Sequence, residues 1–106
     1  MVRLLTSLFV FLLVLSTFAL AFDGPPAPPE GLSVRAGLYG GAALHWDSTS
    51  GALAYRVYKA VDGSPFWKIA DLVHQEFLDW YVVPGHSFDY YVTALNLNGE
   101  STPSAT

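Results

Sequence analysis

The side chains of this chain that could do acid–base or metal chemistry are three histidines and nine carboxylates. His45, His74 and His86 lack the short, regular spacing that brings imidazoles onto one metal ion, so we interpret them as surface residues. They are accompanied by no nucleophile elbow or oxyanion loop, which a Ser-His-Asp hydrolase would need. The sequence therefore predicts no catalytic histidine and no metal site.

Carboxylates offer a second route to catalysis, because two of them facing across a cleft can hydrolyse a glycosidic bond. The candidates for such a pair are Asp71, Glu76, Asp79 and Asp89. A chain of 106 residues leaves little room for a cleft around a sugar. Asp62 and Asp71 lack the alternating acids of a calcium loop, and Gly40-Gly41 lacks the context of a phosphate-binding loop. We predict no enzymatic activity and no cofactor.

Aromatic side chains are the feature that exceeds the needs of a small fold. The candidates for a binding surface are Tyr58, Trp67, Trp80, Tyr81 and Tyr91. Strand alternation predicts that Tyr58 and Tyr91 face outward on the same sheet as Trp67. Such a patch can cover the edge of a core or pack on an adjoining copy or domain. It can also bind a protein partner or stack against pyranose rings, and the sequence leaves these alternatives open.

Charge and cysteine content narrow the class of partner. The net charge is −4, and it becomes −5 when a segment containing Arg3 is removed. Phosphate backbones are bound by clustered Lys and Arg, whereas the few basic residues here lie between carboxylates, so nucleic acid is not an expected partner. The chain has no cysteine, so packing alone must hold the domain together.

Residues 1–21 have the three parts of a secretory signal peptide. Arg3 supplies the positive start, an apolar run extends from Leu8 to Leu15, and Ala19-Leu20-Ala21 is a small-x-small cleavage site. We predict cleavage after Ala21 and a secreted or extracytoplasmic protein. The alternative is an uncleaved anchor, because this segment approaches the roughly 20 residues that span a bilayer. Membrane contact is expected only in that case.

Two further regions follow the signal segment. Residues 22–31 are a proline-rich leader, which favours polyproline II and cannot join the interior of a sheet. Residues 32–106 contain short β-type runs separated by turn residues, with no sustained helical period. The runs are Leu32–Ala36, Ala42–Trp46, Ala54–Ala60, Phe66–Ala70, Glu76–Trp80 and Ser87–Leu97. Many short strands at intervals of roughly 8–12 residues indicate a sandwich or a barrel.

In order and spacing, the landmarks of residues 25–104 resemble those of a fibronectin type III domain. The matching segments are Leu32-Ser33-Val34, Leu44-His45-Trp46, Tyr55-Arg56-Val57-Tyr58, Phe66 to Ala70, Phe77 to Asp79, Pro84-Gly85 and Phe88 to Ala94. The resemblance implies an all-β antiparallel sandwich of about seven strands, the last one short or truncated. With a period of two, Leu44, Trp46 and Val57 point between the sheets, and we expect Trp46 to be the central core residue.

Two positions depart from the family pattern. Phe88 stands where the family usually has a tyrosine whose hydroxyl bonds a loop backbone, so we expect a looser corner there. At Thr106 the last strand would only be starting, which predicts an unpaired edge around Tyr90 to Leu95. A truncated gene, a short last strand and a strand donated by a partner chain are the alternatives.

Two classes of function remain, because this fold hosts adhesion, receptor, spacer and accessory roles alike. The first is a non-enzymatic extracellular protein-interaction or spacer module, self-associating through the open last-strand edge. The second is a carbohydrate-binding or substrate-targeting accessory module that uses its exposed aromatic residues. A planar outward face of Trp67, Tyr58 and Tyr91 would favour the second, and an unpaired edge beside Trp80 and Tyr81 would favour the first.

Overall fold

The computed structural model describes residues 24–106, so the predicted signal peptide (1–21) and the first two leader residues lie outside the described residues. Within this range the chain forms seven β-strands. They are β1 Ser33–Ala36, β2 Ala42–His45, β3 Ala54–Val61, β4 Trp67–Leu72, β5 Glu76–Asp79, β6 Phe88–Asn96 and β7 Gly99–Glu100. No helix in residues 24–106 is long and apolar enough to cross a membrane.

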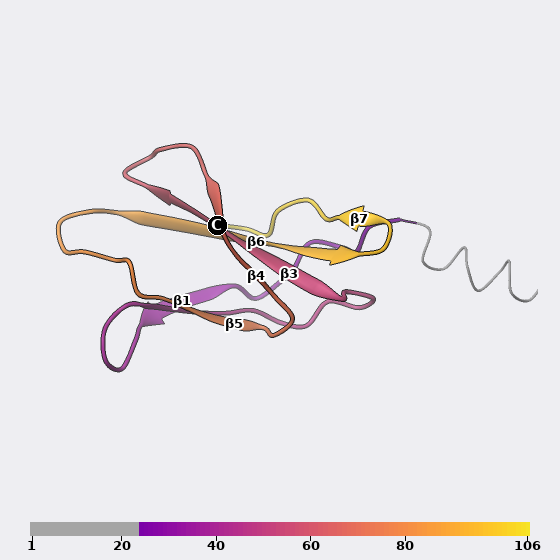
Figure 1. Cartoon of the computed structure of the whole chain (residues 1–106), viewed down its shortest axis with the longest axis horizontal. Helices are drawn as coiled ribbons and strands as arrows, with labels where there is room; N and C mark the ends of the chain where they lie inside the picture. The colour runs from indigo at the N-terminus through magenta and orange to yellow at the C-terminus, as the bar shows by residue number, and fades with distance from the viewer. Residues whose placement is uncertain (1–23) are drawn as a thin grey trace, which may run out of the picture.

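The strands form two antiparallel sheets that lie one above the other (Figure 1). One sheet has the order β1-β2-β5 and the other the order β4-β3-β6-β7. Each strand pair is antiparallel, with Leu44 opposite Phe77 in the first sheet and Val57 opposite Val92 in the second. The prediction of an all-β sandwich is confirmed.

The core lies between the sheets and is built on Trp46, which is fully buried. Tyr55 meets its indole edge-on, with ring centroids 5.7 Å apart. Residues at alternate positions of β2, β3 and β6 complete the core: Ala42, Leu44, Val57, Tyr90, Val92 and Ala94. Alternation places these side chains on one side of each sheet, and the predicted central role of Trp46 is confirmed.

The edge of β6 is bonded where an open edge was expected. After β7, the Ser101 N–H donates to the carbonyl of Ala94 and the Ser104 N–H to that of Val92, at 2.7 and 2.9 Å. The Ala94 and Val92 N–H groups donate in turn to the Oγ atoms of these two serines, each at 2.9 Å. Serine hydroxyls thus accept where strand carbonyls normally would, and the prediction of an unpaired edge around Tyr90 to Leu95 is wrong for Val92 to Leu95.

β4 contains a bulge that changes which side its first residues face. Val57 lies opposite Ala70, but Tyr58 lies opposite Lys68, so Ile69 is an extra residue. Trp67 consequently pairs with Lys59, whose side chain is on the inner side of the sheet. The prediction that Trp67 shares a face with Tyr58 and Tyr91 is therefore wrong.

Candidate functional site

The five predicted surface residues divide into two groups on opposite sides of the sheet β4-β3-β6-β7. Tyr58 and Tyr91 are opposite each other on β3 and β6 and face outward. Trp67, Trp80 and Tyr81 lie together on the other side, where they line one groove. The two groups are therefore separate surfaces.

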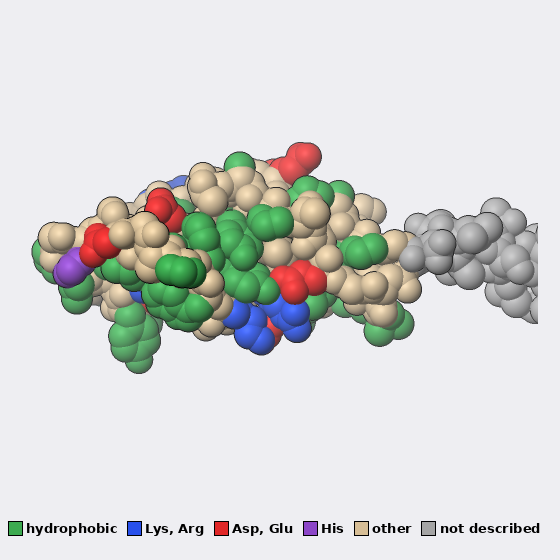
Figure 2. All heavy atoms as spheres, turned by 90° about the horizontal axis from the view of Figure 1, so that it is seen from above, with side chains coloured by type: hydrophobic (Ala, Val, Ile, Leu, Met, Phe, Trp, Pro, Cys, Tyr) green, Lys and Arg blue, Asp and Glu red, His purple; other side chains and the backbone are tan. Residues whose placement is uncertain are grey.

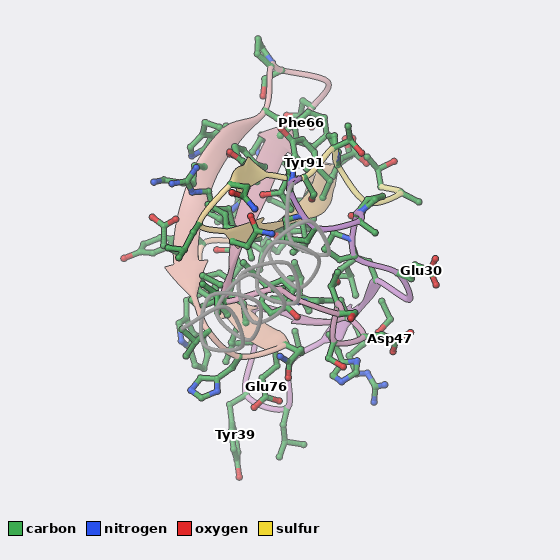
Figure 3. The ribbon with its side chains drawn as sticks, turned by 90° about the vertical axis from the view of Figure 1, so that its right-hand side faces the viewer. Glu30, Tyr39, Asp47, Phe66, Glu76 and Tyr91 are labelled. Atoms are coloured by element: carbon green, nitrogen blue, oxygen red, sulfur yellow. The ribbon has the colours of Figure 1, made fainter. Side chains whose placement is uncertain are left out.

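On the outer face the tyrosine rings are engaged with one another. Tyr58 and Tyr91 stack with centroids 4.6 Å apart and planes inclined by 16°. The Phe66 ring lies beside that of Tyr91, with centroids 4.7 Å apart and planes inclined by 55°, and Figure 3 labels the two residues next to each other. Three rings packed in this way do not form a single flat, open platform, so the condition that would favour sugar stacking is not met.

Charged groups border this aromatic cluster. Figure 2 shows a hydrophobic patch with acidic and basic side chains beside it on the face seen from above. Glu100 accepts hydrogen bonds from the Tyr58 hydroxyl at 2.5 Å and from Thr93 Oγ1 at 2.7 Å, and Arg56 Nη1 lies 2.9 Å from it. Burial acts to raise the pKa of Glu100, but these donors hold it below its usual value. Burial, followed by the bond to Glu100, raises the pKa of Tyr58 to about 12. The polar side chains of this cluster thus form their hydrogen bonds with one another, which is typical of a network that stabilises the fold.

The second group forms what we call the aromatic groove, a hollow of about 370 Å³. It lies beside β4 and β5, which are outer strands of different sheets. Its walls are Trp67, Ile69, Phe77, Trp80 and Tyr81. Trp67, Trp80 and Tyr81 are 46%, 59% and 86% exposed, so much of their aromatic surface meets solvent. This concentration of exposed aromatic surface is what a contact site requires.

A buried ion pair lies at the base of the groove. Lys59 Nζ is 2.6 Å from Asp79 Oδ2, and both side chains are 4% exposed. The Tyr90 hydroxyl donates to the same carboxylate oxygen at 2.7 Å, and the Tyr81 N–H donates to Asp79 Oδ1 at 3.0 Å. The pair joins β3 of one sheet to β5 of the other and bonds the start of the β5–β6 loop. Lys59 and Asp79 therefore fix the segment that carries Trp80 and Tyr81.

Lys59 also takes over the role of the missing corner tyrosine. Its Nζ donates to the Tyr81 carbonyl at 2.6 Å and lies 4.8 Å from the centre of the Phe88 ring. In the family, a tyrosine hydroxyl bonds this loop backbone. Here the Lys59 ammonium group bonds it instead and lies against the ring of Phe88, which replaces the tyrosine. The expected hydrogen bond from the corner residue is lost, but the loop is held by another donor.

A close glycine contact helps to place Asp79. Gly41 has a φ of +80°, and a Cβ atom there would lie 2.7 Å from the Asp79 carbonyl oxygen. Both the backbone conformation and the space therefore require glycine. Gly40-Gly41, which in the sequence lacks the context of a phosphate-binding loop, lets the β1–β2 turn approach the end of β5.

The ion pair is expected to make stability depend on acid pH. Burial acts to raise the pKa of Asp79, but bonds from Lys59, Tyr90 and the Tyr81 N–H hold it below its ordinary value of 3.8. A carboxyl group whose pKa is lower in the folded state than in the unfolded state stabilises the fold at pH values above its unfolded-state pKa. This stabilisation is lost as the pH falls through the folded-state pKa. We predict that Asp79→Asn lowers the free energy of unfolding at pH 7 and that the difference from wild type shrinks below about pH 4. Urea titrations at several pH values check this, and an unchanged difference at pH 2.5 would contradict it.

Lys59 is the important residue that sequence reasoning missed. A signal was present, because Lys59 follows Tyr55 and Val57 at the period of two that marks inward positions. A lysine in that phase predicts a buried partner. The partner is not evident in sequence, since Asp79 lies on another sheet.

The histidines lie where the sequence indicated. His45, His74 and His86 are all exposed, and His86 Nδ1 lies 2.6 Å from Asp62 Oδ2. In residues 24–106 no group of three or more carboxylates and histidines is arranged to hold a metal ion.

Comparison with known proteins agrees with this architecture. No protein-family model and no curated protein matches the sequence. Among solved structures, an Fn3-like protein from Clostridium thermocellum is 32% identical, over 76% of this chain and 86% of that one, with a TM-score of 0.68. The structure named FN3tt mut has 23% identity, coverage of 77% and 94%, and a TM-score of 0.69, and it supports the fold alone.

A third solved structure is much longer than this chain. It is the bacterial orthologue of human α-L-iduronidase, which is 33% identical over 72% of this chain but only 14% of its own length, with a TM-score of 0.58. Similarity to one part of a long chain is expected for a module. With two sheets of three and four antiparallel strands and a 32% identical relative covered over most of its length, this chain belongs to the fibronectin type III family.

Proposed function

We propose that this domain is a non-catalytic protein-contact module of an exported protein and that the aromatic groove is its contact surface. The observation that carries the proposal is the gathering of Trp67, Trp80 and Tyr81 around one hollow, each with much of its side chain in solvent. Exposed aromatic surface of this density favours burial against a partner.

The chemistry of the groove favours a protein partner over a sugar. Sugar sites combine an aromatic platform with polar groups that bind hydroxyls. The charged groups at the base of the groove, Lys59 and Asp79, are buried and bonded to each other and to Tyr90 and Tyr81. They are not available to a ligand, so the residues that line the groove offer aromatic and apolar walls without a free charged group, which suit a protein partner.

The hydrogen bonds along β6 argue against the last-strand edge as the contact surface. Residues 99–104 bond β6 from Val92 to Asn96, so strand addition there would have to displace existing hydrogen bonds. The outer strand β4 carries a bulge and Lys68, two devices that discourage edge pairing. Side-chain burial in the groove is therefore the better-supported mode of association.

The first partner to test is a second copy, by light scattering of residues 22–106 over a concentration series. We predict association that rises toward ~1 mM, where about 4 kcal/mol of binding free energy suffices. Trp80→Ala should reduce it, because this side chain is 59% exposed and its loss removes contact area without disturbing the core. Tyr39→Ala is the matched control, since Tyr39 is 87% exposed and lies outside the groove. A protein that remains monomeric at all concentrations, or associates equally with Trp80→Ala, would contradict contact between copies through this groove.

A carbohydrate-targeting role is the second candidate, favoured by the likeness to part of the α-L-iduronidase orthologue. In that role the module would act beside a catalytic domain. Native gels containing polysaccharides test it: retardation that Trp80→Ala abolishes would favour a sugar ligand, and unchanged mobility across a panel would exclude those polysaccharides.

A further inference from the structure

The proline-rich leader presents one face to solvent and the other to its own domain. Pro25 and Pro28 are exposed, whereas Pro26 is half-buried and Pro29 is buried. This spacing of three matches polyproline II, which has three residues per turn and so places residues i and i+3 on one side. Pro25 and Pro28 therefore form an exposed proline face, held in place by the packing of Pro26 and Pro29.

The leader is fixed at the end of β6 far from the groove. The Gly24 carbonyl accepts a hydrogen bond from Asn96 Nδ2 at 2.9 Å, at the last residue of β6. Trp80 and Tyr81 lie in the β5–β6 loop, which leads into the first residue of β6. The nine residues of β6 span roughly 27 Å at about 3.3 Å per residue. The start of the leader, shown in indigo beside β7 in Figure 1, and the β5–β6 loop thus lie at opposite ends of this strand.

The aromatic groove has the chemistry that polyproline II ligands use. Such ligands dock in aromatic-lined grooves, where proline rings pack on flat side chains. Their backbone has no internal hydrogen bonds, so its carbonyls are free acceptors. In the part of the chain that the structure describes, the Trp67 and Trp80 indoles and the Tyr81 hydroxyl donate no hydrogen bond. Free aromatic donors on one surface thus complement free carbonyls on the other.

We propose that the Pro25–Pro28 face of one copy docks in the aromatic groove of a second copy. This inference rests on the proposed function and names the segment that fills the groove. Because leader and groove are different surfaces at opposite ends of β6, the contact is head-to-tail, and each copy keeps one leader and one groove free. Association of this type forms species larger than dimers as the concentration rises.

The test is a titration of the peptide FDGPPAPPEG, which is residues 22–31, into dilute residues 22–106, followed by tryptophan fluorescence. We expect saturable binding with a blue shift, because Trp67 and Trp80 become covered while Trp46 is already buried. Trp80→Ala should weaken the binding roughly tenfold or more. A peptide with all four prolines replaced by serine should lose binding, because the proline rings that pack in the groove are gone. In residues 22–106 themselves, where Pro26 and Pro29 pack against the domain, Pro25→Ser/Pro28→Ser should abolish the association seen by light scattering.

The outcomes separate this inference from the proposed function. Peptide binding that depends on Trp80 and on the prolines, together with association that depends on Pro25 and Pro28, supports the docking. A peptide that does not bind, binds equally well to Trp80→Ala, or binds equally well without its prolines overturns it, as does association unchanged by Pro25→Ser/Pro28→Ser. If light scattering then still shows association that Trp80→Ala abolishes, the groove remains a contact surface filled by another segment. If that association is also absent, the docking fails together with any contact between copies through the groove.

Discussion

Replacing Lys59 with methionine is expected to lower the free energy of unfolding by about 3–5 kcal/mol, as removal of one partner of a buried ion pair does. The variant leaves the Asp79 carboxylate buried without its countercharge. It also removes the hydrogen bond from Nζ to the Tyr81 carbonyl, which holds the β5–β6 loop. Urea unfolding followed by tryptophan fluorescence and by circular dichroism measures the loss.

The double variant Lys59→Met/Asp79→Leu separates charge from packing. Replacing both members of a buried pair with apolar residues removes the unpaired charge and is often close to neutral. We therefore expect the double variant to recover a large part of the stability lost by Lys59→Met. It should not restore association through the groove, because the Tyr81 backbone loses both its bonds, to Asp79 and to Lys59. If Lys59→Met is as stable as wild type, the Lys59–Asp79 pair does not hold the two sheets and the β5–β6 loop together.

Replacing Trp46 with alanine is expected to cost about 3–5 kcal/mol, the usual range for truncating a buried aromatic residue. The side chain is fully buried and contacts Tyr55 between the two sheets. A domain of this size has a total stability of roughly 5–15 kcal/mol, so the variant retains little reserve at 25 °C. Chemical denaturation with circular dichroism as the readout measures the change.

Trp80→Ala is the matched control for the core variant, because it removes the same side chain from an exposed position. Surface substitutions of this kind usually change stability by less than about 0.5 kcal/mol. Equal losses for Trp46→Ala and Trp80→Ala would mean that the indole between the sheets is not the centre of the core.

Local pattern was sufficient to predict most of the strands. Alternation along Tyr55-Arg56-Val57 and along Tyr90-Tyr91-Val92 assigns inner and outer positions that the structure confirms. Turn residues such as Asp62-Gly63 mark where strands end, because Gly63 and Asp62 both adopt positive φ. These short-range signals narrow the fold to a sandwich or a barrel, and the resemblance to fibronectin type III domains selects the sandwich.

The site depends on features that short-range pattern does not contain. One extra residue at the bulge in β4 reverses the side faced by Trp67, and no local residue type marks it. Pairing of Lys59 with Asp79 crosses from one sheet to the other. Closure of the β6 edge uses the hydroxyls of Ser101 and Ser104, which in sequence read as ordinary loop residues. These features decided which aromatic residues share a surface.

The central claim is that the aromatic groove is the contact surface, and a dilution series of ¹H–¹⁵N correlation spectra of residues 22–106 tests it most directly. We predict that the indole N–H signals of Trp67 and Trp80 and the amides of the β5–β6 loop move with concentration. The indole signal of buried Trp46 should stay fixed and serve as the internal reference. Concentration-dependent shifts confined to the exposed residues Leu38 and Tyr39, or to Leu53 and Leu97, with both groove indoles unmoved, would contradict the account.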